Sequence, residues 1–194
     1  MENKANETAA MLAEKYNIHL SAFSTNALAD ILVYKKYYKD ETVLSGGQIC
    51  RDFYIVNVGM LRQFYYKNGR NITEHFSCEG SIAFNIESLF LQKPSDLCME
   101  AIEDSEVYLL NYADFKHLAS ENKEIGALLL VILEKDLIES QHKADSWRFE
   151  TSHERYERFC REYPEASKRA SIAHIASYLL MAPETLSRVR AGIL

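Results

Sequence analysis

The most informative segment of this sequence is IAHIASYLLMAPETLSRVR, residues 172–190. Its first half has apolar residues at helical spacing, which are Ile172, Ile175, Ala176 and Leu179. Leu186 and Val189 mark the apolar face of a second helix after a tight turn. Pro183 favours the start of that second helix, because its fixed φ suits the first turn and its missing N–H is not needed there. The segment therefore predicts two short helices joined by a turn.

The second predicted helix has a polar face that can contact DNA bases. Glu184 and Arg188 are four residues apart, so both side chains project from one face. An Arg donates two parallel hydrogen bonds to guanine, a Glu accepts one from the cytosine amino group, and Ser or Thr binds bases or phosphate. The alternative is a solvent-exposed ion pair, which is common on helices and contributes only about 0.2–0.5 kcal/mol. The candidate DNA-contacting residues are Glu184, Thr185, Ser187, Arg188 and Arg190, with Lys168 and Arg169 from the preceding segment.

The run A-x-Y-L-x-M-x-P-E-T-L-S-R-V-R, ending at Arg190, resembles the helix-turn-helix of the Crp/Fnr family of bacterial transcription regulators. The resemblance covers roughly residues 20–194, because the preceding chain is similar to that family's cyclic-nucleotide-binding-type β-roll and dimerisation helix. It implies a homodimeric regulator that binds double-stranded DNA. The sequence departs from the family at Leu180, where relatives usually have Gly in the turn. Either this turn has different dihedral angles, or a bulky residue with positive φ weakens it.

Length and composition are those of a folded globular protein. A chain of 194 residues is long enough for one large or two small domains. Its hydrophobic content of 47% is ordinary for a folded protein. No apolar run approaches the 18 or more residues of a membrane span. The N-terminal residues lack the apolar segment of a secretory signal. These features predict a cytoplasmic protein without a membrane partner.

The charge distribution favours a DNA-facing C-terminal end, although the net charge of the chain is −6. Residues 1–145 have 14 Lys and Arg against 22 Asp and Glu, whereas residues 146–194 have 8 against 6. The acidic part can therefore point away from the phosphate backbone.

The predicted fold is α+β, with an N-terminal double-stranded, jelly-roll-like β-roll, a long dimerisation helix and a C-terminal helix-turn-helix domain. Short helices are expected over residues 5–16 and 24–33, with Ser24 and Thr25 as candidate caps. Between Tyr34 and Tyr112 the hydrophobic pattern changes from the helical period to the alternating period of β-strands. Asn68-Gly69 is a strong hairpin signal in this segment. The expected domains are residues 1–145, which include the dimerisation helix at about 114–140, and residues 146–194.

The long helix is expected to have a break near Asn122. Its apolar stripe consists of Ile125, Leu128, Leu129, Ile132, Leu133 and Leu137. Leu130 and Val131 make the opposite side apolar as well, so two surfaces must cover the helix. The β-roll and the same helix of a second copy are the simplest pair, and a single buried helix in a monomer is the alternative. A helix end is expected at Tyr163-Pro164, and relatives often insert a small β-hairpin, or wing, near here.

The effector site is expected to differ from that of cyclic-AMP-responsive relatives. Those proteins use an Arg-Ser pair to neutralise the cyclic phosphate, and Ser95 or Asp96 stands where the Arg would be. Cyclic AMP is therefore predicted not to bind in the usual manner. The candidate pocket residues are Ser81, Asn85, Glu87, Ser88, Ser95 and Asp96, which either hold a small-molecule effector such as an anion or form a pocket without a ligand.

No cofactor, metal site or catalytic site is predicted. The four cysteines lack C-x-x-C spacing, and the six histidines include no H-x-x-x-H pair. Neither a phosphate loop nor a nucleophile elbow is present. The sequence therefore predicts a DNA-binding regulator and no enzyme. The alternative is a small-molecule-binding β-roll protein whose C-terminal helices bind a protein partner.

Overall fold

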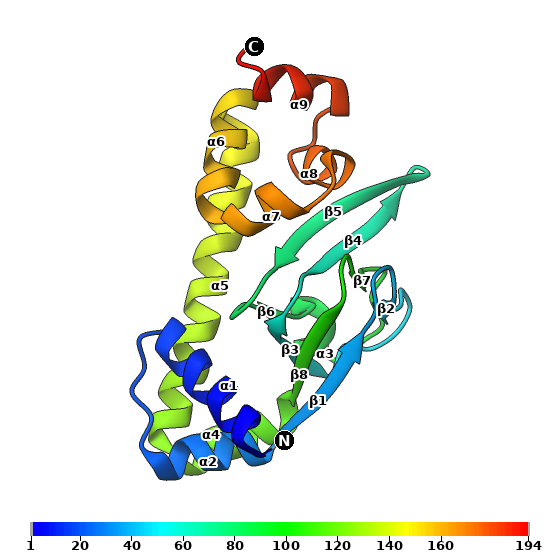
Figure 1. Ribbon diagram of the computed structural model, residues 1–194. Coiled ribbons are helices and arrows are strands. Elements are labelled where there is room, and N and C mark those ends of the chain that lie inside the picture. The colour runs from blue at the N-terminus through cyan, green and yellow to red at the C-terminus, as the bar shows by residue number, and fades with distance from the viewer. Residues whose placement is uncertain (1, 194) are drawn as a thin grey trace.

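The computed structural model describes residues 2–193, with the backbone alone for residues 2 and 147. Two four-stranded antiparallel sheets face each other and form the predicted β-roll (Figure 1). One sheet has the order β1 (Leu32–Tyr37), β8 (Ser105–Asn111), β3 (Asp52–Val58), β6 (Ile82–Ala83). The other has the order β2 (Thr42–Leu44), β7 (Cys98–Ala101), β4 (Leu61–Lys67), β5 (Arg70–Ser77). The α+β fold class and the β-roll predicted from the sequence are confirmed.

The strongest local signal in the roll, Asn68-Gly69, forms the predicted hairpin turn. Asn68 and Gly69 have φ values of 52° and 72°, so both are left-handed. Two left-handed central residues match the twist of the strands that they join. β4 and β5 therefore form a long hairpin, paired from Leu61↔Ser77 to Lys67↔Arg70.

The two N-terminal helices have their predicted positions, but the cap of the second is different. α1 is Glu2–Lys15 and α2 is Ala22–Asp30. Ser21 caps α2, rather than Ser24 or Thr25, and its Oγ accepts from the Ser24 amide at 3.3 Å. The Ser21 amide and hydroxyl also donate to Glu124, at 2.7 and 2.9 Å. A partner more than 100 residues away therefore fixes the start of this helix.

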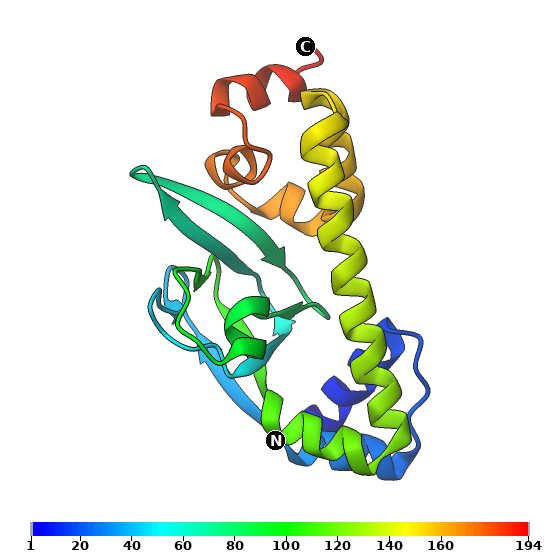
Figure 2. The ribbon, with the colours of Figure 1, turned by 180° about the vertical axis from the view of Figure 1, so that it is seen from behind.

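The long helical region divides at Asn122, as predicted. α4 is Tyr112–Glu121 and α5 is Lys123–Phe149. The Asn122 Oδ1 accepts from the amides of Glu124 and Ile125, at 3.0 and 3.3 Å, which caps α5. α5 runs along one side of the whole molecule (Figures 1 and 2). It continues to Phe149, so the boundary expected after residue 145 falls inside its last turns.

Four helices follow α5 within the described residues, and the last two form the predicted helix-turn-helix. They are α6 (Ser152–Glu162), α7 (Pro164–Arg169), α8 (Ile172–Tyr178) and α9 (Pro183–Arg190). Thr151 and Glu154 form a capping box at the start of α6. Tyr163 separates α6 from α7, which confirms the helix end expected there, and α7 occupies the segment where relatives often have a wing. A short helix, α3 (Ile86–Leu91), lies in the roll.

Two hydrophobic cores lie in the described part of the chain. The larger fills the roll and is closed by α1, α2, α4 and the first turns of α5. The second is shared between the roll and the C-terminal helices: Met60 and Phe76 pack with Phe159, Tyr178 and Leu186. The helix-turn-helix is thus joined to the roll by a common core.

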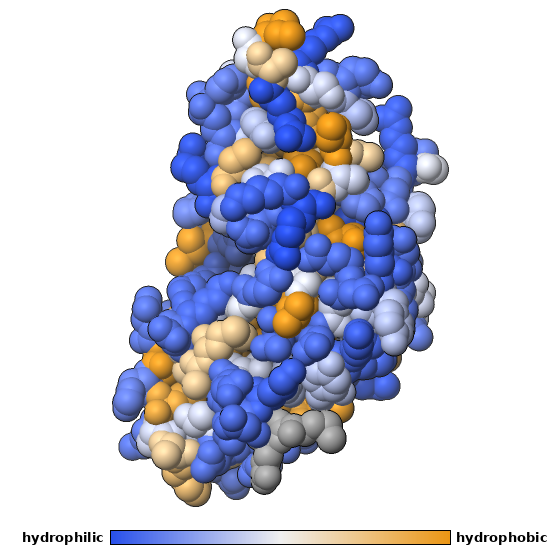
Figure 3. Space-filling model, viewed as in Figure 1, coloured by the Kyte–Doolittle hydropathy of each residue, from blue (hydrophilic) through white to orange (hydrophobic). Residues whose placement is uncertain are grey.

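The face in Figure 3 is mainly hydrophilic, and hydrophobic residues form small separate patches on it. Among residues 2–193, none of the helices combines the length and the apolar character that a membrane crossing requires.

Candidate DNA-binding face and effector cavity

The polar face of α9 is open to solvent. Leu186 and Val189 are buried and attach α9 to α6 and α8. The side chains on the opposite face, Glu184, Ser187 and Arg188, are exposed, and Thr185 is half-buried. The described residues include no ion pair between Glu184 and Arg188. The ion pair that the sequence left open as the alternative is therefore not formed in this structure.

The turn between α8 and α9 keeps a left-handed residue at Leu180, with φ of 52°. The Leu180 amide donates to the Ser177 carbonyl at 3.3 Å, and the Met181 amide donates to the Ala176 carbonyl at 3.0 Å. These bonds satisfy the last carbonyls of α8 in the way that a glycine turn does. Of the two outcomes left open by the sequence, the structure has the strained turn.

The other three predicted DNA contacts occupy different surroundings. Arg190 is exposed at the end of α9 and lies beside Tyr156 of α6. Lys168 is exposed, and its Nζ pairs with Glu165 at 2.9 Å. Arg169 faces the roll, where its guanidinium contacts Glu79 at 2.6 and 2.9 Å and Glu103 at 2.9 Å. The structure therefore does not bring Arg169 to the face of α9.

The helix-turn-helix lies against the β4–β5 hairpin. Thr73 of β5 donates its amide to the Ser177 hydroxyl at 3.1 Å, and the two hydroxyls are 2.6 Å apart. Phe76 contacts the rings of Phe159 and Tyr178, with centroids 5.9 and 5.8 Å apart. These contacts join residues about 80–100 positions apart, so no local pattern in the sequence indicated them.

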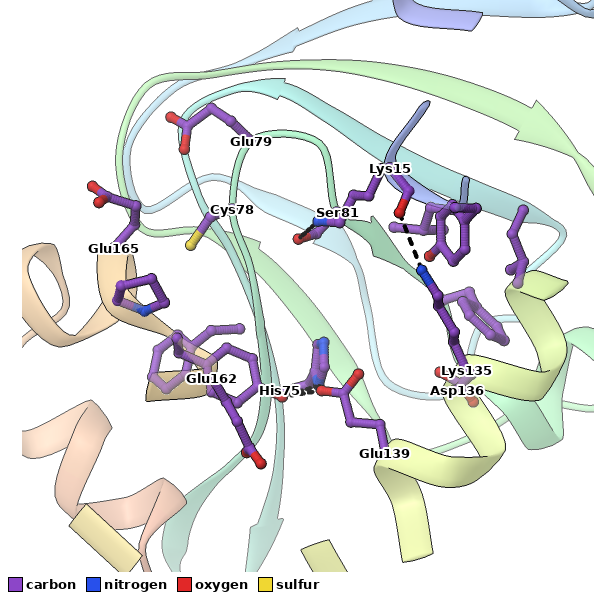
Figure 4. A pocket seen from close by; sticks show the side chains of 17 residues that line it. Lys15, His75, Cys78, Glu79, Ser81, Lys135, Asp136, Glu139, Glu162 and Glu165 are labelled. Carbon is purple, nitrogen blue, oxygen red and sulfur yellow. Dashed lines mark hydrogen bonds and ion pairs between the residues drawn. The ribbon is translucent and has the colours of Figure 1, made fainter. Parts of the chain in front are cut away.

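A cavity of about 400 Å³ lies where α1, β5, α5 and the α6–α7 corner meet (Figure 4). Lys15 enters it from α1, where its Nζ donates to Ser81 Oγ at 2.9 Å. His75 lies next to Glu139 in the cavity wall, with its Nδ1 3.8 Å from the carboxylate and 3.3 Å from the Tyr163 hydroxyl. The Tyr163 hydroxyl also donates to Glu139.

A second cavity of about 210 Å³ shares His75, Asp136 and Glu139 with the first. Lys143 borders it, and its Nζ contacts Glu74 Oε1 at 2.7 Å. Asn85 lies in its wall, buried, with no hydrogen-bond partner for Nδ2 among the described residues.

The six predicted effector residues do not converge on one cavity. Ser81 lines the larger cavity, and Asn85 and Glu87 line the smaller. Ser95 and Asp96, with Glu87, line an open hollow beside β4. Ser88 is buried and bonds to the backbone, accepting from the Cys50 amide at 2.9 Å and donating to the Lys93 carbonyl at 2.6 Å.

Burial shifts the titration of several cavity groups. It raises the pKa of Asp136 to about 6, and the negative charge of Glu139 adds to the shift. Burial lowers the pKa of Lys15 and of Lys143, although nearby carboxylates oppose that change. Burial also lowers the pKa of His75, which favours the neutral ring at pH 7.

Sequence reasoning missed most of these cavity residues. Lys15, His75, Asp136, Glu139 and Lys143 come from three elements, and only the fold brings them together. The one available signal was polar Asp136 and Lys143 on the long apolar helix. Within residues 2–193, no group of three or more His, Cys, Asp or Glu side chains is placed to hold a metal ion.

Comparison with known proteins identifies the family of the β-roll. Residues 34–122 match the family described as the cyclic nucleotide-binding domain. None of the curated proteins matches the sequence.

Several solved structures are similar over most of their length. FixK2 from Bradyrhizobium japonicum is 22% identical, with 84% of each chain covered and a TM-score of 0.71. The catabolite activator protein from Thermus thermophilus is 20% identical, with 94% of this chain and 86% of that chain covered and a TM-score of 0.58. A protein from Eubacterium rectale described as a regulator of the Crp/Fnr family is 14% identical, with 89% and 83% covered and a TM-score of 0.65. The resemblance seen in the sequence is therefore confirmed: residues 34–122 match the cyclic nucleotide-binding domain family, and the chain has the Crp/Fnr-type regulator fold.

Proposed function

We propose that the protein is a transcription regulator that binds specific DNA sequences as a homodimer through α9. The main support is the open polar face of α9, where Glu184 and Arg188 stand side by side without an ion pair between them. An unpaired Arg and Glu at this spacing match the hydrogen-bonding edges of a G·C-containing site in the major groove. Ser187 is exposed on the same helix and would contact phosphate or a base edge, and the neighbouring Thr185 is half-buried.

A second copy is proposed to pack on the outer face of α5. Ile125, Leu128 and Ile132 are buried against the roll. Leu130, Leu137 and Ile138 point away from it and are 57%, 70% and 52% exposed. The outer face of α5 extends over most of the length of the molecule (Figure 2). A two-fold dimer would place two copies of α9 about one DNA turn apart, so the binding site should be roughly palindromic.

Cyclic AMP is not proposed as the effector in the family's usual manner. The carboxylates of Glu74, Glu87, Asp136 and Glu139 border the smaller cavity, and Lys143 is its one cation among the described residues. Lys143 already contacts Glu74, so the site would repel a cyclic phosphate. A small-molecule effector without a phosphate remains compatible with either cavity.

The proposed readout is tested by selecting bound duplexes from a random pool and then measuring the Arg188→Ala variant on the selected site. Loss of a bidentate contact to guanine should cost about 1–3 kcal/mol and relax discrimination at one base pair. Lys168→Ala is the matched comparison, because loss of a phosphate contact should weaken all duplexes alike.

Unchanged discrimination between duplexes in Arg188→Ala would show that α9 does not read bases through this residue.

A salt titration separates DNA binding from the alternative of a protein partner. Phosphate contacts make the affinity for duplex DNA fall steeply with salt. A protein that binds no duplex at low salt would contradict the proposed function.

A further inference from the structure

The tip of the β4–β5 hairpin has two cations directly opposite each other. Lys67 and Arg70 flank the Asn68-Gly69 turn and are paired in register. Like charges at directly opposite positions destabilise a hairpin. The described residues provide no ion pair for either side chain, and both are exposed. An anion from another molecule would offset this repulsion.

This tip lies next to the recognition helix. Arg70 and Ile72 line one side of a hollow of about 620 Å³, and Ala182 and Pro183 line another. Pro183 is the first residue of α9, the end of a recognition helix that enters the major groove. Figures 1 and 2 both show the tip reaching out alongside α8. A duplex on α9 would therefore pass close to Arg70.

The hairpin is held firmly against the helix-turn-helix. Arg62 of β4 is 2% exposed, and its guanidinium donates to Asn71 at 2.8 Å, to Thr73 at 2.9 Å and to Glu100 at 2.8 Å. Thr73 in turn bonds to Ser177 of α8. A contact made by the tip would need little further ordering of the chain, so it would cost little conformational entropy.

We propose that Arg70 is a further contact to the DNA phosphate backbone, with Lys67 beside it, and that the β4–β5 hairpin serves as a wing for the helix-turn-helix. The ligand is the phosphate of double-stranded DNA next to the bases at α9, so the contact adds affinity without sequence preference. Lys67 also shares a hollow with Glu87 and Asp96, and their negative charges weaken its attraction for phosphate. This inference rests on the proposed DNA-binding function.

The test compares full-length wild type with Arg70→Gln on the selected duplex and on an unrelated one, over a range of salt concentrations. The slope of log affinity against log salt should become shallower by about 0.9 for one lost phosphate contact. Affinity should fall by a similar factor for both duplexes. Arg70→Lys keeps the charge and should retain most of the slope.

The matched control is Arg51→Gln, which removes an exposed Arg from the opposite end of the roll. Arg51 precedes β3, whose first residue Asp52 pairs with Asn111 at the start of α4. This variant should keep the wild-type slope.

If wild type binds DNA and Arg70→Gln has the same slope, the hairpin contact is overturned and the proposed function stands. If Arg70→Gln alters discrimination between duplexes and leaves the slope unchanged, the phosphate assignment is overturned. If wild type binds no duplex at low salt, both proposals fail.

Discussion

At the scale of single residues, Leu180 shows how one side chain can conflict with the backbone around it. Its φ of 52° is a conformation that costs an L-residue roughly 1–2 kcal/mol. The side chain is 47% exposed, so burial offsets only part of this cost. The turn is kept because Ala176 and Ser177 accept hydrogen bonds that end α8.

Leu180→Gly should therefore stabilise the helix-turn-helix. We expect the free energy of unfolding to rise by about 0.5–1 kcal/mol. The strain energy removed at this φ is larger than the cost of the extra conformational entropy that Gly loses on folding. Urea unfolding and hydrogen exchange of the amides in α8 and α9 would measure it. Leu180→Ala is the control: it keeps the Cβ and the strain, and should give no gain. Equal stability of the Gly and Ala variants would mean that the turn is not strained.

Asp136 is a second residue whose surroundings oppose its charge. Its pKa rises from 3.8 to about 6, through burial and the negative charge of Glu139. The folded protein therefore binds this proton more tightly than the unfolded chain. The stability contributed by the protonated form is complete below about pH 3.8 and is lost as pH rises through about 6.

Asp136→Asn should raise the free energy of unfolding at pH 7.5, because the variant has no buried carboxylate to ionise. The gain should be on the order of 1 kcal/mol, after allowance for partial exposure to solvent. It should shrink as pH falls below about 6 and disappear well below pH 3.8, where Asp136 is protonated in the unfolded chain as well. Urea midpoints against pH would show this, with Glu134→Gln on the exposed side of α5 as the charge-matched control. A gain that does not vary with pH would contradict the assignment.

At the scale of elements, α7 is attached to the roll by charge as well as by the shared core. Arg169 at its end contacts Glu79 and Glu103, and these carboxylates raise its pKa further above the usual value. The position of this Arg near the helix-turn-helix suggested a phosphate contact. Its side chain instead joins the C-terminal helices to the roll, so it helps to set where α9 stands relative to the hairpin.

Arg169→Gln should loosen the C-terminal helices without unfolding the roll. A partly exposed ion-pair cluster of this kind contributes about 1 kcal/mol, so local opening of α7–α9 should become about fivefold more frequent. Hydrogen exchange of these helices would measure it, and amides of β3 and β8 should be unaffected. Arg161→Gln, an exposed Arg on α6, is the control. Equal protection in the two variants would mean that the cluster does not hold the helices.

At the scale of the whole molecule, α5 has two apolar sides and the described chain covers one. The inner side lies in the core of the roll, while Leu130 and Leu137 remain in solvent. Apolar groups repeated along a helix in this way are typical of a helix–helix interface. The proposed function depends on it, because a palindromic site requires two copies of α9.

Leu137→Glu should convert the proposed dimer to a monomer. The two-fold axis would bring two carboxylates together in an apolar interface, where burial of unpaired charge costs several kcal/mol. Sedimentation of wild type and variant would give the mass directly. Leu91→Glu on α3 is the control, since that leucine is 57% exposed and belongs to a different element. Wild type that sediments as a monomer would contradict the proposed dimer.

The sequence by itself determined the local parts of this protein. The turn at Asn68-Gly69, the cap at Asn122, the helix start at Pro183 and the apolar contacts of Leu186 and Val189 all follow from residues a few positions apart. Such features depend on dihedral preferences and on the periods of helix and strand, which are written in short stretches of chain.

Only the tertiary structure decided which distant side chains meet. It gave Ser21 its partner Glu124, turned Arg169 toward Glu79, and distributed Ser81, Asn85 and Ser95 among separate hollows. It also placed Arg70 and Pro183 on the lining of one hollow, although they are more than a hundred residues apart in the chain. Burial and charge pairing depend on these long-range neighbours. A pattern within one short stretch cannot specify them, because the same residue has a different role against each partner that the fold supplies.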